Sequence, residues 1–211
     1  MIVTYLKSDF EKLLVTANEI WFAVALIKDS TFDYVQETIN EDCKQNYLVG
    51  IDLPTNPKIL WNMQSQLKND LFEAAIYKTE YNFHPKAYLI KSNDNFTAFI
   101  GSSNLTDGGL EDNIELNYKI TNQEDCLSIL NWFNALYKES YPLTEENIIA
   151  YEEQFNSLKE IEKELKKKRK SFKLKKPVSI TNPLDAIDFS DRYFKKEHHL
   201  AFRKELWTND S

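Results

Sequence analysis

The sequence predicts an α/β domain in which helices flank a mixed central sheet. Continuous apolar runs alternate with amphipathic segments along most of the chain, and this alternation is typical of a sheet covered by helices. Gly is scarce, and three of its four occurrences are Gly101, Gly108 and Gly109, so unusual backbone conformations are expected there. No apolar run approaches the roughly 18 residues that a membrane-spanning helix needs.

The first part of the chain contains strands and helices in alternation. Residues 5–14 are amphipathic and predict a helix, whereas residues 20–27 form a continuous apolar run, the signature of a strand buried on both faces. The same reasoning assigns the next elements in order: a helix over 31–39, a strand over 47–52, a helix over 59–67 and a strand over 72–77.

A β-hairpin is predicted next. Residues 87–90 and 96–100 are short apolar runs with aromatic and β-branched side chains, and the turn-forming residues 91–95 separate them. Residues 113–120 then predict a third strand of the same group. Together these segments place a meander of three strands in the middle of the chain.

The C-terminal part is predicted to be helical. Residues 123–137 carry an apolar stripe at spacings of three and four, which indicates a helix packed on the sheet. Pro142 interrupts the chain, and Thr144, followed by Glu145 and Glu146, is suited to begin a second helix. We therefore expect a helical C-terminal extension to the α/β domain.

Charge is distributed unevenly along the chain. The formal net charge is −7, but residues 159–177 carry 10 Lys and Arg against 3 Glu, so the total hides a basic segment. Such a stripe beside an active site can bind phosphates despite an acidic total. It can equally be the solvated face of a charged helix, and both interpretations remain open.

The composition favours a reducing compartment without a bound metal. Cys43 and Cys126 are far apart and form no Cys-x-x-Cys motif, and no signal-peptide pattern is recognised, so we expect a cytoplasmic protein. His198 and His199 are adjacent, but no Cys or paired acidic ligands accompany them. We expect neither a cofactor nor a metal ion.

A group of polar residues is expected to gather at the end of the hairpin. His84 and Lys86 lie two apart on a segment that Pro85 keeps extended, so their side chains project from one face. Ser102 and Asn104 follow the second strand directly. In an antiparallel hairpin the start of the first strand faces the end of the second, which brings these four residues together.

These residue types suit phosphoryl chemistry. An imidazole such as that of His84 can attack phosphorus or protonate a leaving oxygen. The Lys86 ammonium can neutralise phosphate oxygens, while Ser102 and Asn104 can supply neutral hydrogen bonds. Glu115 lies on the third predicted strand, where it can orient the imidazole and fix its tautomer. No cluster of carboxylates is needed, so the chemistry can proceed without a metal.

The order of these residues resembles the motif of the phospholipase D superfamily. That motif has His-x-Lys, four residues and Asp, and then Gly-Ser-x-Asn downstream. The likeness is greatest to the branch of bacterial endonucleases and metal-independent restriction enzymes. The residues that carry this closer likeness are Leu105, Thr106, Gly108, Gly109, Leu110, Asn113 and Glu115. The motif's Asp falls where this chain has Lys91, so the resemblance implies that Glu115 takes the carboxylate role.

The resemblance implies a phosphodiesterase, most specifically a DNA endonuclease of restriction or phage defence that forms a phosphohistidine. The chain holds one copy of the motif, which implies a homodimer with its active site at the two-fold interface and leaves room for a separate specificity subunit. Two alternatives remain: a phospholipase or phosphatidyltransferase, and a dimer that binds nucleic acid or a partner without cutting. The missing motif Asp and the lack of a membrane-binding segment count against the lipid enzyme.

Three regions follow from this interpretation. Residues 1–142 are expected to form a phospholipase D-like catalytic domain, with a mixed sheet flanked by helices, and residues 143–177 a long charged helix. Residues 178–211 are too few to fold alone and offer several aromatic side chains. We expect this last region to dock on the main domain, on a second copy or on a partner.

Overall fold

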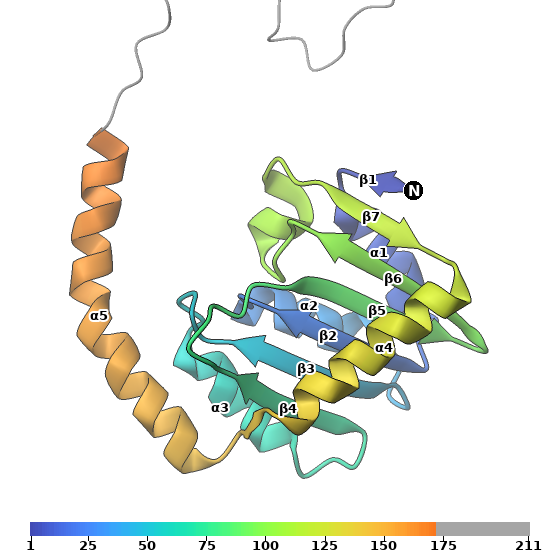
Figure 1. The fold of residues 1–211 in the computed structure, drawn as a ribbon, viewed down its shortest axis with the longest axis horizontal. Helices are drawn as coiled ribbons and strands as arrows, with labels where there is room; N and C mark the ends of the chain where they lie inside the picture. The colour runs from blue at the N-terminus through green and yellow to red at the C-terminus, as the bar shows by residue number, and fades with distance from the viewer. Residues whose placement is uncertain (172–211) are drawn as a thin grey trace, which may run out of the picture. The chain divides into compact units, whose positions relative to one another are not determined.

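The computed structural model describes residues 1–171, and it contains one mixed sheet with helices on both faces (Figure 1). The predicted fold class is therefore confirmed. The predicted extension over 178–211 and the boundary near Pro177 lie outside the described residues.

Eight strands make up the sheet, in the order β1-β7-β6-β5-β2-β3-β4-β8. The neighbours β2, β3 and β4 run parallel to one another, while all other pairs are antiparallel. The strand bounds are β1 Ile2–Val3, β2 Glu19–Val24, β3 Lys44–Gly50, β4 Phe72–Tyr77, β5 Lys86–Ser92, β6 Asn95–Gly101, β7 Asn117–Ile120 and β8 Tyr141–Pro142.

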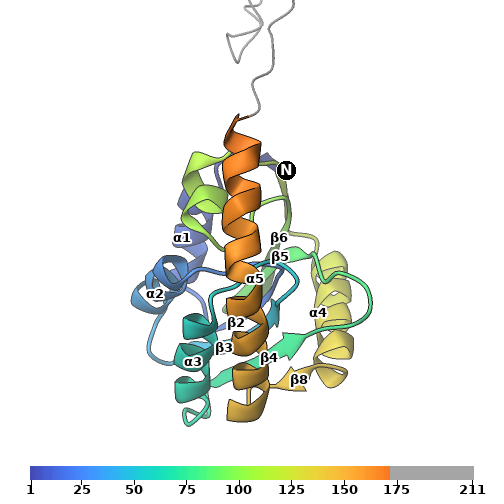
Figure 2. The same ribbon diagram turned by 90° about the vertical axis from the view of Figure 1, so that its left-hand side faces the viewer.

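Helices cover the two faces of the sheet unequally. Helices α1, α2 and α3 lie on one side of the sheet and α4 on the other (Figure 2). The helix bounds are α1 Leu6–Leu14, α2 Asp29–Thr38, α3 Pro57–Gln66, α4 Gln123–Lys138 and α5 Glu145–Ser171, with a short π-helical turn, η1, over Gly108–Asp112. One compact unit spans Met1–Lys163, so α5 begins inside this unit and continues beyond it.

The larger core lies under α1, α2 and α3 and is rich in aromatic rings. The Phe10 ring of α1 lies 5.3 Å from the Phe22 ring of β2 and 5.3 Å from the Tyr88 ring of β5. All three side chains are fully buried. Since β2 sends Phe22 to this core and its neighbours Trp21 and Ala23 to the other, the strand is buried on both faces, as its continuous apolar run predicts.

The smaller core lies under α4. Cys126 and Phe133 are buried there, and the remaining members of the predicted apolar stripe pack around them: Ile129, Leu130, Leu136 and Tyr137. The three- and four-residue spacing thus identified the buried face of α4 correctly. Helix α5 begins where the Thr144 hydroxyl accepts a hydrogen bond from the Asn147 N–H at 3.3 Å, which confirms the predicted cap.

Several predicted boundaries are wrong. The hairpin turn is shorter than residues 91–95, because Ser92 pairs with Asn95 and only Asn93 and Asp94 remain between the strands. Asn93 adopts a φ of 53°, a conformation that Asn tolerates and that tight hairpins require. The strand predicted over 113–120 begins only at Asn117, so Glu115 precedes β7 and does not lie on it.

The strand predicted over residues 20–27 also ends earlier. β2 stops at Val24, and Ile27 instead forms an isolated parallel bridge with Leu105, in the loop after β6. The last apolar residues of the run are therefore buried by a loop contact and not by the sheet. Within residues 1–171, no helix is both long enough and apolar enough to cross a membrane.

Candidate active site

Three chain segments meet at one edge of the sheet, where β5 begins and β2 and β6 end. β5 is antiparallel to both of its neighbours, and its first residue, Lys86, pairs with Val24 at the end of β2. On the other side Ala87 pairs with Ile100 near the end of β6. The residues just before β5, just after β2 and just after β6 therefore emerge together. His84 and Lys86 share this edge with the segment that contains Ser102 and Asn104.

His84 and Lys86 are in direct contact. The Lys86 ammonium lies 2.7 Å from His84 Nδ1 and donates to the His84 carbonyl oxygen at 3.0 Å. Lys86 is buried, whereas the His84 side chain is exposed to solvent. Burial lowers the pKa of Lys86, and the nearby Glu115 carboxylate partly opposes this by favouring the charged ammonium. A buried cation therefore stands beside an accessible imidazole.

Glu115 is fixed by neighbours on the same loop. The Ser102 hydroxyl donates to one carboxylate oxygen of Glu115, and the Asn113 amide donates to the other at 3.2 Å. The Ser102 oxygen in turn accepts the Leu116 N–H at 2.9 Å. In the described part of the chain the ring of His84 is hydrogen-bonded by Lys86 and not by Glu115. The orientation of the imidazole by Glu115 therefore stays a prediction.

Asn104 presents a polar group without a partner. Its side-chain oxygen is buried and accepts no hydrogen bond from any residue in 1–171. A buried acceptor left unpaired costs about 1–3 kcal/mol, so Asn104 is a candidate for contact with a bound group. Gly109 packs directly on this residue, and a side-chain carbon there would collide with the Asn104 backbone. The glycine thus lets η1 close over Asn104.

Position 91 lies at the opposite end of β5 from the candidate site. Lys91 pairs with Phe96 beside the hairpin turn, five residues along the strand from Lys86. At the usual rise of a strand this separation is about 16 Å, too far for any side chain at position 91 to touch His84. The departure from the family motif at Lys91 therefore leaves the contacts around His84 intact.

Sequence reasoning missed two residues that shape the loop after β6. Ser103 and Asn117 are both buried, and their side chains hydrogen-bond at 2.8 Å. The Asn117 side-chain oxygen also accepts the Ser103 N–H at 3.3 Å. A further contact comes from the Tyr88 hydroxyl, which donates to the Ser103 carbonyl at 2.7 Å. A polar Asn at the start of an apolar strand was the available signal for this role.

We expect Tyr88→Phe to lower the free energy of unfolding by about 1–3 kcal/mol, because it leaves the buried Ser103 carbonyl without its donor. Urea unfolding measures this. Tyr47→Phe is the matched control: Tyr47 is equally buried, but its hydroxyl contacts the side chains of Gln36 and Gln45, which can rearrange. Equal losses in the two variants would contradict the proposed role of the Ser103 contact.

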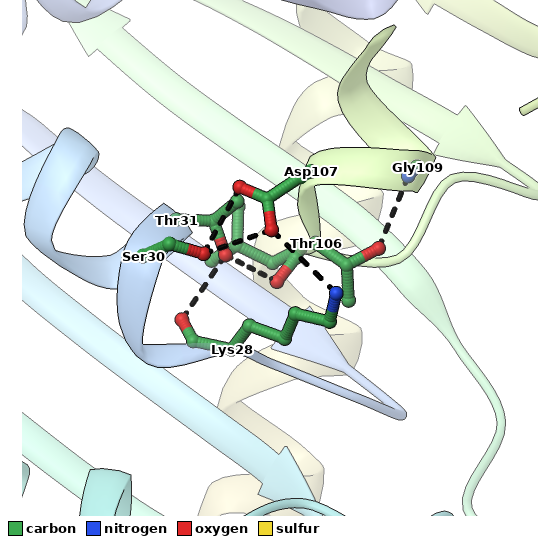
Figure 3. Close-up of polar contacts among 7 residues, drawn as sticks. Lys28, Ser30, Thr31, Thr106, Asp107 and Gly109 are labelled. Atoms are coloured by element: carbon green, nitrogen blue, oxygen red, sulfur yellow. Dashed lines mark hydrogen bonds and ion pairs between the residues drawn. The ribbon is translucent and has the colours of Figure 1, made fainter. Parts of the chain in front are cut away.

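The start of α2 clamps the next part of this loop. The Thr31 hydroxyl donates to the Leu105 carbonyl at 2.5 Å, and the same oxygen accepts the Lys28 N–H at 3.0 Å. Figure 3 shows the Lys28 and Ser30 side chains pointing toward Asp107, with the Ser30 hydroxyl 2.9 Å from each carboxylate oxygen and the Lys28 ammonium at 3.5 Å. The loop that begins at Ser102 is therefore fixed from two sides.

Together these groups can act on a phosphodiester. The site supplies an exposed imidazole at His84, a buried ammonium at Lys86, a hydroxyl at Ser102 and an amide at Asn104. Among residues 1–171, no three His, Cys, Asp or Glu side chains gather closely enough to hold a metal ion.

Comparison with known proteins finds one matching family. The family model described as "Cardiolipin synthase, PLD-like domain" matches residues 2–137. No protein of curated function matches the sequence.

Two solved structures are similar to this chain. NucT from Helicobacter pylori has a TM-score of 0.52 and 14% identity, over 64% of this chain and 89% of that chain. Nuc from Salmonella typhimurium, described as a phospholipase D family member, has a TM-score of 0.49 and 11% identity, over 67% of this chain and 97% of that chain. At these identities the likeness to NucT supports the fold alone.

Proposed function

The chain belongs to the phospholipase D-like superfamily of phosphodiesterases, and on that premise we propose that it is a metal-independent DNA endonuclease. The observation that carries the proposal is the contact between the buried Lys86 ammonium and the exposed His84 ring. A cation held out of water stabilises phosphate charge far better than a solvated one, because the local dielectric constant is low. An accessible imidazole beside it can reach phosphorus.

The proposed reaction has two steps. His84 attacks phosphorus, so that an N–P bond forms and a P–O bond breaks, and the leaving oxygen takes a proton from the imidazolium of His84 in a second copy. Water then attacks phosphorus, the N–P bond breaks, and the proton from water returns to that second imidazole. Lys86, the Asn104 amide and the Ser102 hydroxyl hold the phosphate oxygens, and Ser102 does so by turning its hydrogen from Glu115 to the substrate. Glu115 stabilises the positive charge at Lys86 and His84.

DNA is the substrate that we favour. The Gly-Ser-Ser-Asn-Leu-Thr sequence with its Gly-Gly-Leu and Asn-x-Glu resembles the restriction branch of the superfamily, and the basic segment 159–177 offers positive charge for phosphates. We propose a role in restriction or phage defence, with sequence specificity supplied by a separate subunit. A phospholipase or phosphatidyltransferase is the second candidate, because the matching family model carries the description of a cardiolipin synthase.

Separate assays with DNA and with lipid distinguish these functions. Purified protein in EDTA is incubated with supercoiled plasmid and, separately, with vesicles that contain phosphatidylglycerol and cardiolipin. We expect nicked and linear plasmid and no released headgroup. Headgroup release without DNA cutting would establish the lipid enzyme. A plasmid shift in a gel without cutting would establish a dimer that binds nucleic acid without cleaving it.

An exposed apolar strip, formed by Ile2, Ile100, Leu116 and Tyr118, supports the proposed homodimer. Ile100 pairs with Tyr118, and Tyr118 pairs with Ile2, so the three side chains form a row across β6, β7 and β1. All four are exposed, because α4 covers only the adjoining part of this face. The strip ends at Leu116, whose N–H bonds the Ser102 hydroxyl of the candidate site. A second copy seated on this strip would therefore lie next to the candidate site.

Tyr118→Glu is expected to convert the dimer into a monomer and to lower cleavage by about 100-fold, because charge in an apolar interface is not solvated and catalysis then lacks its general acid. Sedimentation and plasmid cleavage measure the two effects. Leu127→Glu is the control, since Leu127 is exposed on α4 outside the strip. A variant that stays dimeric, or a wild type that is monomeric yet active, would contradict the assignment.

A further inference from the structure

The segment that carries His84 is anchored on both of its sides. On one side the Pro85 carbonyl accepts the Ala25 N–H at 2.8 Å, which continues the pairing between β5 and β2. On the other side Phe83 is buried with 6% of its surface exposed. His84 is thus an exposed side chain set between two fixed neighbours, and the contacts of Phe83 decide how firmly it is held.

Asp52, just beyond the end of β3, holds Phe83 through its carboxylate. Its Oδ2 accepts the Phe83 N–H at 2.8 Å, and its Oδ1 forms an ion pair with the Lys78 ammonium. The Asp52 side chain is only 8% exposed, whereas Lys78 is 43% exposed, so the contact with the Phe83 N–H is the better shielded of the two. Hydrogen bonds to a charged acceptor are about twice as strong as neutral ones. One carboxylate thus ties down both ends of the segment from Lys78 to Phe83.

The Phe83 ring fits a place that only a glycine leaves open. A side-chain carbon at residue 50 would lie 2.8 Å from Phe83 Cδ1, which is closer than such atoms approach. The ring can occupy this position because Gly50 has no side chain. On its other side the ring packs against Tyr77 at a centroid distance of 4.9 Å. Gly50 and Asp52 therefore seat the ring and the backbone N–H of Phe83 from the same strand end.

We propose that Asp52 is a positioning residue that fixes the imidazole of His84 for attack through the backbone of Phe83. This proposal rests on the proposed nuclease function. The Asp52 oxygens bond the Phe83 N–H and the Lys78 ammonium, so the proposed effect on His84 passes through the backbone of its neighbour. Its effect comes from geometry alone, since a reacting group displaced by about 1 Å can lose about 100-fold in rate.

The experiment compares two substitutions with different hydrogen-bonding ability. Asp52→Ala removes the acceptor of the Phe83 N–H, while Asp52→Asn keeps an oxygen for that N–H and loses the charge together with the Lys78 ion pair. We expect Asp52→Ala to lower kcat for DNA cleavage by about 30-fold with KM changed less than about 3-fold, and Asp52→Asn to restore kcat to within about 5-fold of wild type. Asp9→Ala is the matched control, because it breaks the ion pair between Asp9 and Lys119 of β7. Strands β6, β5 and β2 separate β7 from β3, which Asp52 follows.

Hydrogen exchange separates this proposal from the nuclease assignment. In Asp52→Ala the Phe83 amide should exchange at least about 10-fold faster, while the Phe22 amide in the core strand β2 keeps its protection. If wild type does not cut DNA, the nuclease function fails. The exchange rate of the Phe83 amide and the ring resonances of His84 still show whether Asp52 positions the imidazole. Unchanged Phe83 exchange, or equal loss of kcat in Asp52→Ala and Asp52→Asn, would overturn the role of Asp52.

Discussion

Replacing His84 with alanine is expected to lower metal-independent DNA cleavage by at least about 10⁴-fold, because losing a covalent nucleophile removes the main reaction path. In the proposed dimer this one change deletes both the nucleophile and the general acid. The side chain is exposed, so its removal leaves the core packing and the free energy of unfolding essentially unchanged. A loss of activity without a loss of stability identifies a catalytic group.

Plasmid cleavage in EDTA measures the effect, with His198→Ala as the control. The chain has three His residues, at positions 84, 198 and 199, so this variant removes one imidazole and keeps His84 in place. Wild type and His198→Ala should cut alike. Rapid denaturation in detergent at alkaline pH, where the N–P bond is stable, should also trap labelled DNA on wild type through a phosphohistidine but not on His84→Ala. Cleavage by His84→Ala would refute the assignment of the nucleophile.

Lys86→Met is expected to lower cleavage by about 10³-fold, because it removes the buried charge that stabilises the phosphoryl transition state. The same change is expected to raise the free energy of unfolding by about 1 kcal/mol, since an apolar side chain of similar length replaces a buried ammonium. Opposite effects on activity and stability are typical of a residue kept for function. Plasmid cleavage and urea unfolding measure the two quantities.

Lys91→Met is the matched control for this substitution. Lys91 lies on the same strand at the far end from the candidate site, so the variant makes the same chemical change in the same element. We expect its cleavage rate to stay within about 2-fold of wild type, because a surface substitution away from the site changes little. Similar losses at positions 86 and 91 would indicate a general effect of charge on DNA binding and would contradict the role of Lys86.

The pH dependence of cleavage offers a further check on Lys86. Burial lowers its pKa, so its ammonium loses the proton at a lower pH than an ordinary lysine does. Because the charged form is the one required, activity should decline on the alkaline side before the range in which exposed lysines titrate. The free energy of unfolding should change in the opposite direction to activity and rise with pH. The cost of burying the charged ammonium is fully present below the pKa of Lys86 in the folded state and is relieved as pH rises through that pKa.

Local patterns in the sequence determined most of the elements and the family. The continuous run around Phe22 identified a strand buried on both faces, and the spacing of Cys126 and Phe133 identified the packed face of α4. The resemblance based on His84, Lys86 and the Gly-Ser-x-Asn segment is confirmed by the family model over residues 2–137. Such features depend on neighbours a few residues apart, which the sequence displays directly.

The tertiary structure alone decided how distant segments meet. Three hydrogen bonds show this. Glu115, which precedes β7, accepts from Ser102, and Asn117 donates to the Ser103 hydroxyl. Asp52 accepts from the Phe83 N–H, 31 residues further along the chain. None of these contacts leaves a periodic signal, because each depends on which strands become neighbours and where they end. The sequence by itself therefore determined the elements and the family, and it supplied the candidate catalytic residues. The fold decided which backbone groups hold those residues in place, because strand order and register arise only when the whole sheet is packed.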